Sequence, residues 1–322
     1  MKEKILSIPS PLGGPIDLYK NSWQATRAPD EVLSIVAGLH GDQVNGLILC
    51  SRLARFLDDI VEGRETRYRL RGWVRIFPVV NVNAVQTGAR LWSLDDMDMD
   101  LSFPGNEVGE VSEQLARALV NHTADSTHGL ILCTARNFYE DAPHLQCLQP
   151  KRSTRKMALG LGLERVRELP ESPAIKLNLL YHWAESDMAA LILSAGSPGR
   201  MDPALCDSLF DSIVNLMVSA GLISGPGPNN EKSRIRIHGV RDQYNFAVNC
   251  AGLFFPRVRV GTFLNQGDTL GEVRDVFSGQ TLETLLVPED GFLLTLRSHP
   301  VIYEKESAAL MLREKKRGFW PF

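Results

Sequence analysis

The sequence of 322 residues lacks most features that would assign it to a special class of protein. Its apolar runs stay well below the roughly 18 residues of a membrane-spanning helix. The run before Pro9 is also too short for a secretory signal. Neither sign of charge dominates, because 35 Lys and Arg residues stand against 38 Asp and Glu residues. The net charge of -3 gives no global field that attracts nucleic acid or an anionic membrane.

Cysteine is sparse as well, and its spacing argues against a disulfide framework. The five cysteines are odd in number and form no C-x-x-C pair, as is usual for a protein kept in a reducing compartment. We therefore expect a soluble, cytoplasmic protein that binds neither nucleic acid nor membranes. With 44% hydrophobic residues, the chain can bury a large core without covalent staples.

Four short apolar runs predict buried strands at residues 31–39, 73–82, 128–135 and 188–196. Amphipathic patterns between and after them predict helices at residues 46–63, 111–124 and 203–221. Strands that alternate with helices are typical of an α/β domain with a largely parallel sheet. In such folds the functional residues gather in loops at the carboxyl ends of the strands.

The composition and the hydrophobic pattern of the sequence change after Gly221. Residues 224–234 have the glycine, proline and asparagine of a linker, and short apolar runs separated by glycines follow them. We predict an α/β domain over residues 1–225 and a β-domain over residues 226–322, with a terminal helix at residues 305–318. The apolar tail FWPF at residues 319–322 is expected to pack on the protein's own body or on a partner subunit.

One motif points to chemistry. The stretch SIVAGLHGDQVNG at residues 34–46 ends a predicted strand at a glycine-flanked His40 and opens a predicted helix. In the same order along the chain follow VVNVNAVQTGARLWSLDDMDMDLSFPG (79–105), HGLILCTA (128–135) and LILSAGSPGRMDPAL (191–205). The glycine-spaced strands GLFFPRVRVGTFLNQGDTLGEV and LLVPEDGFLLTL complete the series.

This ordered set resembles the succinylglutamate desuccinylase/aspartoacylase family, whose members are related to the zinc carboxypeptidases. The resemblance covers nearly the whole chain. It implies an α/β fold with a zinc-carboxypeptidase-like mixed, largely parallel sheet flanked by helices, followed by a small barrel-like β-domain. It also implies hydrolysis of an acylated amino acid at a zinc ion.

At the metal positions, however, the resemblance reveals substitutions. His40 matches the first zinc ligand of the family. Gln43 stands where the family has a glutamate ligand, and Cys133 stands where it has a histidine ligand. A neutral amide cannot offset the charge of zinc, whereas a cysteine could still bind it as a thiolate.

The catalytic and substrate positions are also changed. Arg90 matches an arginine that binds a substrate carboxylate or polarises the scissile carbonyl. Asp100 and Leu101 replace an Asn-Arg pair, which removes a positive donor from the substrate site. Ser194 replaces the catalytic glutamate, and a serine cannot accept a proton from water at neutral pH.

Two functions are compatible with these substitutions. In the first, the chain is a catalytically degenerate pseudoenzyme that serves as a binding or scaffolding subunit, as a homo-oligomer or beside an active paralogue. In the second, it is a divergent zinc-dependent deacylase of an N-acyl amino acid or a related amide or ester. We expect no cofactor unless zinc is held by a site rebuilt around His40 and Cys133, and we expect a small carboxylate-bearing ligand.

Several single residues leave further alternatives open. Cys133 beside His40 is either a thiol nucleophile with its base or a small buried hydrophobe. The run DDMDMD at residues 95–100 is either a hard-cation site or a solvated acidic loop beside the cleft, and it lacks the glycine and glutamate of a calcium loop. A substitute metal ligand could come from His122, His128 or His144, the last of which is expected in a loop.

Overall fold

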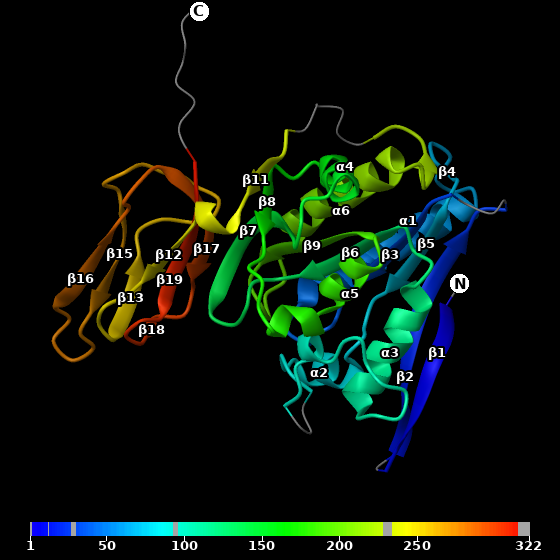
Figure 1. The fold of residues 1–322 in the computed structure, drawn as a ribbon, viewed down its shortest axis with the longest axis horizontal. Coiled ribbons are helices and arrows are strands. Elements are labelled where there is room, and N and C mark those ends of the chain that lie inside the picture. The colour runs from blue at the N-terminus through cyan, green and yellow to red at the C-terminus, as the bar shows by residue number, and fades with distance from the viewer. Residues whose placement is uncertain (1, 12, 27–29, 93–95, 228–233, 315–322) are drawn as a thin grey trace, which may run out of the picture.

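The computed structural model of the protein describes residues 2–11, 13–26, 30–92, 96–227 and 234–314 (Figure 1). The helices are α1 (Val44–Val61), α2 (Val82–Thr87), η1 (Met99–Leu101), α3 (Val111–Thr123), α4 (Arg152–Leu161), η2 (Ala174–Leu177), α5 (Leu179–Glu185), α6 (Pro203–Ser219) and η3 (Val240–Asp242). The first strands are β1 (Lys2–Ser10), β2 (Gly13–Gln24), β3 (Val32–Val36), β4 (Arg69–Leu70), β5 (Trp73–Phe77), β6 (His128–Cys133), β7 (Tyr139–Cys147), β8 (Arg165–Glu168), β9 (Ala189–Gly196) and β10 (Ile223–Ser224). The later strands are β11 (Arg236–His238), β12 (Gln243–Ala247), β13 (Gly252–Pro256), β14 (Phe263–Leu264), β15 (Thr269–Arg274), β16 (Thr281–Leu286), β17 (Gly291–Arg297), β18 (Val301–Ile302) and β19 (Ser307–Arg313).

A mixed sheet of 13 strands forms the centre of the molecule, with the path β1-β2-β5-β3-β6-β9-β7-β17-β19-β12. Its middle strands β5, β3, β6 and β9 are parallel, whereas β7 runs antiparallel to β9. The parallel strands are mostly apolar, as expected for strands that helices cover on both faces. Their carboxyl ends meet at one edge, which is where the candidate site lies.

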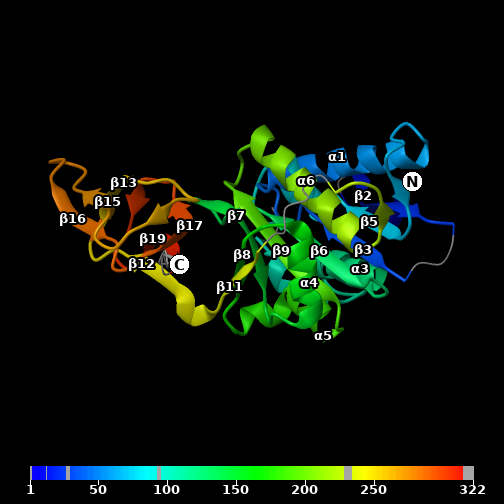
Figure 2. The ribbon, with the colours of Figure 1, turned by 90° about the horizontal axis from the view of Figure 1, so that it is seen from above.

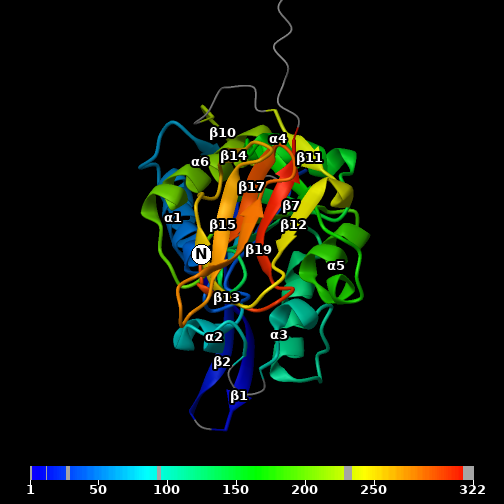
Figure 3. The ribbon, with the colours of Figure 1, turned by 90° about the vertical axis from the view of Figure 1, so that its left-hand side faces the viewer.

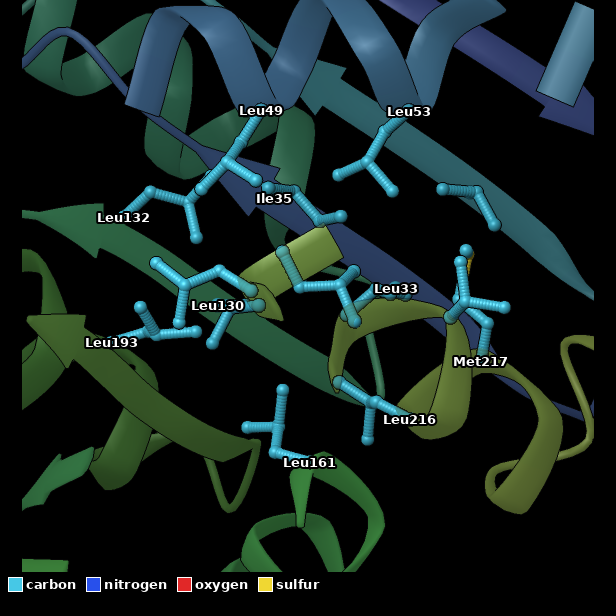
Figure 4. Packing of buried hydrophobic residues seen from close by; sticks show 14 of the residues in the cluster. Leu33, Ile35, Leu49, Leu53, Leu130, Leu132, Leu161, Leu193, Leu216 and Met217 are labelled. Carbon is cyan, nitrogen blue, oxygen red and sulfur yellow. The ribbon is translucent and has the colours of Figure 1, made fainter. Parts of the chain in front are cut away.

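Side chains that alternate along the parallel strands pack into two hydrophobic cores, one on each face of the sheet. On one face, Leu33 and Ile35 of β3 pack with α1, α4 and α6, and Figure 4 shows Leu49, Leu53 and Met217 of this core (Figure 4). On the other face, Val36 packs with side chains of α3 and α5. Figure 2 shows α1 and α6 together on one side of the sheet. These cores fix the ends of β3, β6 and β9 relative to one another.

The strands after β11 carry a third hydrophobic core of their own. A separate sheet with the order β16-β15-β13-β18 packs there beside β12, β17 and β19 (Figure 3). Strand β17 also pairs with β7, so the central sheet continues into the C-terminal region. This pairing brings C-terminal strands against the end of the α/β sheet and supplies a second wall for the site.

The structure confirms the predicted fold class and the four predicted strands, which are somewhat shorter than their apolar runs. It also confirms the three predicted helices as α1, α3 and α6. The predicted terminal helix is wrong over the described residues, because residues 307–313 form strand β19 between β12 and β17. Its backbone pairs with a strand on each side, and a helix could not make these cross-strand pairs. The FWPF tail lies outside the described residues.

Other segments were not predicted. Strands β1 and β2 form an antiparallel pair, which extends the sheet because β2 pairs with β5. Residues 139–147 form β7, whose polar composition hides a strand that is buried at most of its positions. No helix within the described part of the chain is long and apolar enough to cross a membrane.

Candidate functional site

A cavity of about 310 Å³ opens at the carboxyl ends of β3, β6 and β9. His40 follows β3, Cys133 ends β6, and Ser194 lies near the end of β9. Cys133 and Ser194 are direct partners in the parallel pairing of β6 with β9. The opposite side is lined by residues of β7, β8, β12, β17 and β19. The cavity therefore lies between the α/β sheet and the C-terminal strands.

The backbone of the loop that holds His40 has room only for glycine at position 41. A Cβ atom on Gly41 would lie 1.8 Å from the carbonyl oxygen of Ala84. The Gly41 amide also donates a hydrogen bond of 2.9 Å to the carbonyl of Ala89. The His-Gly pair thus docks the loop tightly on the segment around α2, and it holds the buried His40 ring in one place.

Both ring nitrogens of His40 are engaged. Nε2 lies 2.7 Å from Oδ1 of Asp98, and the Gln43 amide nitrogen lies 3.0 Å from Nδ1. A carboxylate only accepts, so Nε2 carries the proton and Nδ1 accepts from Gln43. Burial opposes ionisation of Asp98, but the hydrogen bond and charge of His40 outweigh it and lower the Asp98 pKa to about 2. A carboxylate behind a histidine in this way fixes its tautomer and orientation.

Three side chains here could hold a metal ion on geometric grounds. The ligand atoms of His40, Asp98 and Asp100 all lie within 4.8 Å of one another. Asp100 Oδ2 is 3.7 Å from Nε2 of His40, and burial raises the Asp100 pKa. The structure thus corrects the interpretation of DDMDMD as a solvated loop for Asp98 and Asp100, which reach His40; Asp95 lies outside the described residues.

The family's own ligand positions fit a catalytic zinc ion poorly. Gln43 is the N-cap residue of α1, yet its side chain does not cap the helix and instead donates to His40 Nδ1, the nitrogen left free for a metal. Its Oε1 atom is buried and has no hydrogen-bond partner among the described residues. Burial raises the pKa of the Cys133 thiol, so that the thiolate that zinc needs is disfavoured. Without a charged ligand, these positions do not reproduce the family's zinc site.

Ser194 does not stand alone at the position of the missing glutamate. Its hydroxyl donates a hydrogen bond of 2.7 Å to Oδ2 of Asp141, on the adjacent strand β7. The Thr295 hydroxyl donates to the other oxygen of Asp141 at 2.6 Å. Asp141 is buried and lines the cavity, so a carboxylate is present beside position 194 although the sequence there supplies none.

The three histidines considered as substitute ligands are not brought to His40. His144 lies within β7 and not in a loop, is buried, and pairs across the sheet with Ser194. Its Nδ1 donates to the Ala142 carbonyl at 2.9 Å, and its Nε2 accepts from Gln146 at 3.0 Å. His128 begins β6, at the opposite end of the strand from Cys133. His122 contacts Lys20 near the hairpin β1-β2.

The predicted substrate residues divide between the cavity and the surface. Arg90 and Asp100 line the cavity, and Arg90 Nη2 lies 3.5 Å from Oδ2 of Asp98. Leu101 is 45% exposed and is not among the lining residues.

Sequence reasoning missed the basic residues of the opposite side. Arg136, in the loop after β6, and Arg167, on β8, both line the cavity. Nε of Arg167 donates to Oε1 of Gln243 at 2.9 Å, and burial lowers the Arg167 pKa. No motif marks these arginines, because the strand β8 that holds Arg167 was itself not predicted.

The fold and the position of this cavity define a carboxypeptidase-like α/β protein with a C-terminal β-domain. The sequence profile described as the succinylglutamate desuccinylase/aspartoacylase catalytic domain matches residues 29–132. The chain is thus similar in sequence to the succinylglutamate desuccinylase/aspartoacylase family over residues 29–132.

Individual relatives match over almost the full length. An N-alpha-acetyl-L-2,4-diaminobutyric acid deacetylase of Halomonas elongata is 24% identical over 307 residues, which is 88% of this chain and 84% of the relative. The structure of a succinylglutamate desuccinylase/aspartoacylase from Rhodobacter sphaeroides superimposes with a TM-score of 0.81 at 20% identity, covering 98% of this chain and 96% of the other. The product-bound ectoine utilization protein EutE (DoeB) of Ruegeria pomeroyi gives 0.80 at 17% identity, covering 97% and 95%. At these identities the superpositions show a common fold.

Proposed function

We propose that the chain binds a small organic molecule in this cavity and does not hydrolyse it by the metal-dependent route of its family. The observation that carries the proposal is the hydrogen bond from the Gln43 amide to Nδ1 of His40. An amide at this position donates to the ring, whereas a carboxylate would share a cation with it. The substitution therefore replaces a metal contact by a hydrogen bond within the protein.

The other substitutions support the same proposal. Zinc at a catalytic centre needs three protein ligands and an open position for water. Here the buried thiol of Cys133 resists ionisation, and Ser194 cannot act as a general base. Loss of a general base alone costs roughly 10²- to 10⁴-fold in rate. The cavity itself is retained, with its polar and charged lining, so the chain acts as a binding or scaffolding subunit, alone or beside an active relative.

A second candidate function is favoured by Asp141. Its Oδ2 lies 2.7 Å from the Ser194 hydroxyl, close to where the carboxylate of a glutamate at position 194 would reach. In a divergent deacylase, Asp141 would accept the proton of the attacking water in place of that glutamate. An N-acyl amino acid is then the substrate class, as in the name of the Halomonas elongata relative.

Metal content and hydrolysis together test the proposal. The protein is purified without chelator or added metal, and its zinc content is measured by elemental mass spectrometry. Amine release from a panel of N-acetyl amino acids is then followed with and without added zinc. We expect far less than one zinc per chain and no amine release above the rate without protein.

If zinc is found, variants show whether the cavity holds it. The proposal is wrong if the wild type holds about one zinc that is lost in both His40→Ala and Cys133→Ala, and if it releases amine. Cys250→Ala is the matched control, because Cys250 is a partly buried thiol in the C-terminal region, outside the residues that line the cavity. Loss of amine release in Asp141→Asn would then support the deacylase.

A further inference from the structure

Two arginines on one face of β8 differ in how their charge is balanced. Arg165 and Arg167 are two positions apart in the strand and so point to the same side of the sheet. Arg165 pairs with Glu164, and its Nε lies 2.7 Å from Oε1 of the buried Glu314. Arg167 forms no ion pair with a carboxylate among the described residues. Its one hydrogen bond there goes to the neutral amide oxygen of Gln243.

An unbalanced, half-buried guanidinium is costly unless an anion reaches it. Asp141 is the carboxylate whose charge acts on Arg167, but both of its oxygens already accept hydrogen bonds from Ser194 and Thr295. Within the part of the chain that the structure describes, Arg136 forms no ion pair with a carboxylate either, and its guanidinium lies over the Tyr139 ring at 4.5 Å. This end of the cavity thus has two arginines against one aspartate, whose charge the two neutral hydroxyl donors leave in place.

The geometry of Arg167 suits a carboxylate in particular. Gln243 holds Nε, whereas Nη1 and Nη2 of this cavity-lining side chain make no hydrogen bond to the described residues and can serve as a two-pronged donor. Arg90 already lies 3.5 Å from Asp98, so the charge left to balance is the single positive charge by which Arg136 and Arg167 exceed Asp141. One carboxylate balances this excess, whereas a doubly charged phosphate would exceed it and meet Asp141.

We propose that Arg167, assisted by Arg136, anchors the carboxylate of the bound molecule at the end of the cavity formed by β7, β8 and the C-terminal strands. The inference rests on the proposed function only in that the cavity holds a small molecule. It assigns the ligand-binding charge to a residue outside the family motifs. It also makes Gln243 a positioning residue, because its amide from β12 fixes the direction of the Arg167 guanidinium.

The first test needs no ligand. Arg167→Met and the matched Arg165→Met remove an arginine from the same face of β8. A residue kept for binding contributes little to stability, so Arg167→Met should keep or raise the wild-type Tm. Arg165→Met removes one of the partners of the buried Glu314, which keeps Arg236 and His238, and should lower Tm by several degrees. A fall in Arg167→Met as large as that in Arg165→Met would overturn the proposal.

The second test uses named probes. Succinate, acetate and N-acetyl-L-aspartate are titrated into wild type by calorimetry, with succinamide as the uncharged counterpart and inorganic phosphate as the alternative anion. We expect a carboxylate to bind more tightly than succinamide and phosphate, and Arg167→Met to weaken it about 10- to 100-fold. Arg167→Lys keeps the charge but not the fork, and should fall between the two.

The outcomes separate this inference from the proposed function. Carboxylate binding that is unchanged in Arg167→Met overturns the inference and leaves binding in the cavity intact. Preference for phosphate over every carboxylate also overturns it. Wild type that binds none of these probes overturns both proposals. Zinc-dependent amine release by the wild type, with a raised KM in Arg167→Met, overturns the proposed function and supports the inference.

Discussion

The two walls of the cavity differ in where their residues come from and in the charge they carry. The motif wall consists of His40, Gln43 and Cys133, which follow or end neighbouring parallel strands. The far wall consists of Asp141, Arg167 and Thr295, which come from β7, β8 and β17. The motif wall has kept its positions but lost the carboxylate that its family places there. The far wall carries charged residues that lie outside the motifs of the family.

This difference teaches which part of the molecule to examine for function. The residues that differ from the family on the motif wall remain packed, since Gln43 bonds to His40 and Asp98 orients the ring. The charged groups of the far wall form a network instead, in which Asp141 receives two hydroxyl groups and Arg167 stays available. We therefore assign recognition of the proposed ligand to the far wall.

The largest expected effect comes from restoring the motif wall. In the double variant Gln43→Glu and Cys133→His, Nδ1 of His40 would face a carboxylate and an imidazole, which are ligands that zinc prefers. We expect zinc content, measured by elemental mass spectrometry after dialysis, to rise from a trace to about one per chain. Gln146→Glu changes another cavity-lining glutamine and should gain no zinc. If the double variant binds no zinc, the residues at positions 43 and 133 are not what keeps zinc from the motif wall.

The docking of the motif wall can be broken at Gly41. A methyl group there would overlap the Ala84 carbonyl, so the backbone must move, and we expect Gly41→Ala to lower the free energy of unfolding by about 3 kcal/mol. Gly88→Ala is the control, because Gly88 has a φ of +67° but open space around its Cβ position. It should cost about 1 kcal/mol from backbone strain alone. Urea unfolding gives both values, and equal losses would contradict the close contact.

The sequence predicted the motif wall well and the far wall hardly at all, for physical reasons. Strands such as β3 and β6 are buried on both faces and read as apolar runs, so their ends, and with them His40 and Cys133, could be placed together. Strand β7 is polar because it faces the cavity, and β19 resembles a helix in composition although cross-strand pairing decides its state. The contact of Asp141 with Thr295 joins residues 154 positions apart, which no local spacing reveals.

The far wall can be broken at Asp141. Asp141→Ala removes the shared acceptor of two hydroxyl groups and leaves the nearby arginines without an opposing charge. We expect a loss of about 2 kcal/mol in the free energy of unfolding from urea titration. Thr295→Val removes one of the two donors and should cost about 1 kcal/mol. If Asp141→Ala is as stable as wild type, the network does not hold the far wall together.

The smallest effect concerns pH and His144, which lies behind the far wall. Burial lowers its pKa below the ordinary histidine value of about 6.5, so the folded protein keeps it neutral where the unfolded chain becomes protonated. Stability is therefore unaffected by this group above pH 6.5 and falls as the pH drops below it. The slope from one such proton is at most about 1.4 kcal/mol per pH unit.

His144→Gln removes the titrating group, so the urea midpoint of the variant should fall less steeply than that of wild type between pH 7.5 and 5.5. Burial also lowers the pKa of His128 and His238, which keeps part of the slope in the variant. Identical slopes in the two proteins would mean that His144 is protonated at no cost, and that the far wall is open to water behind Ser194.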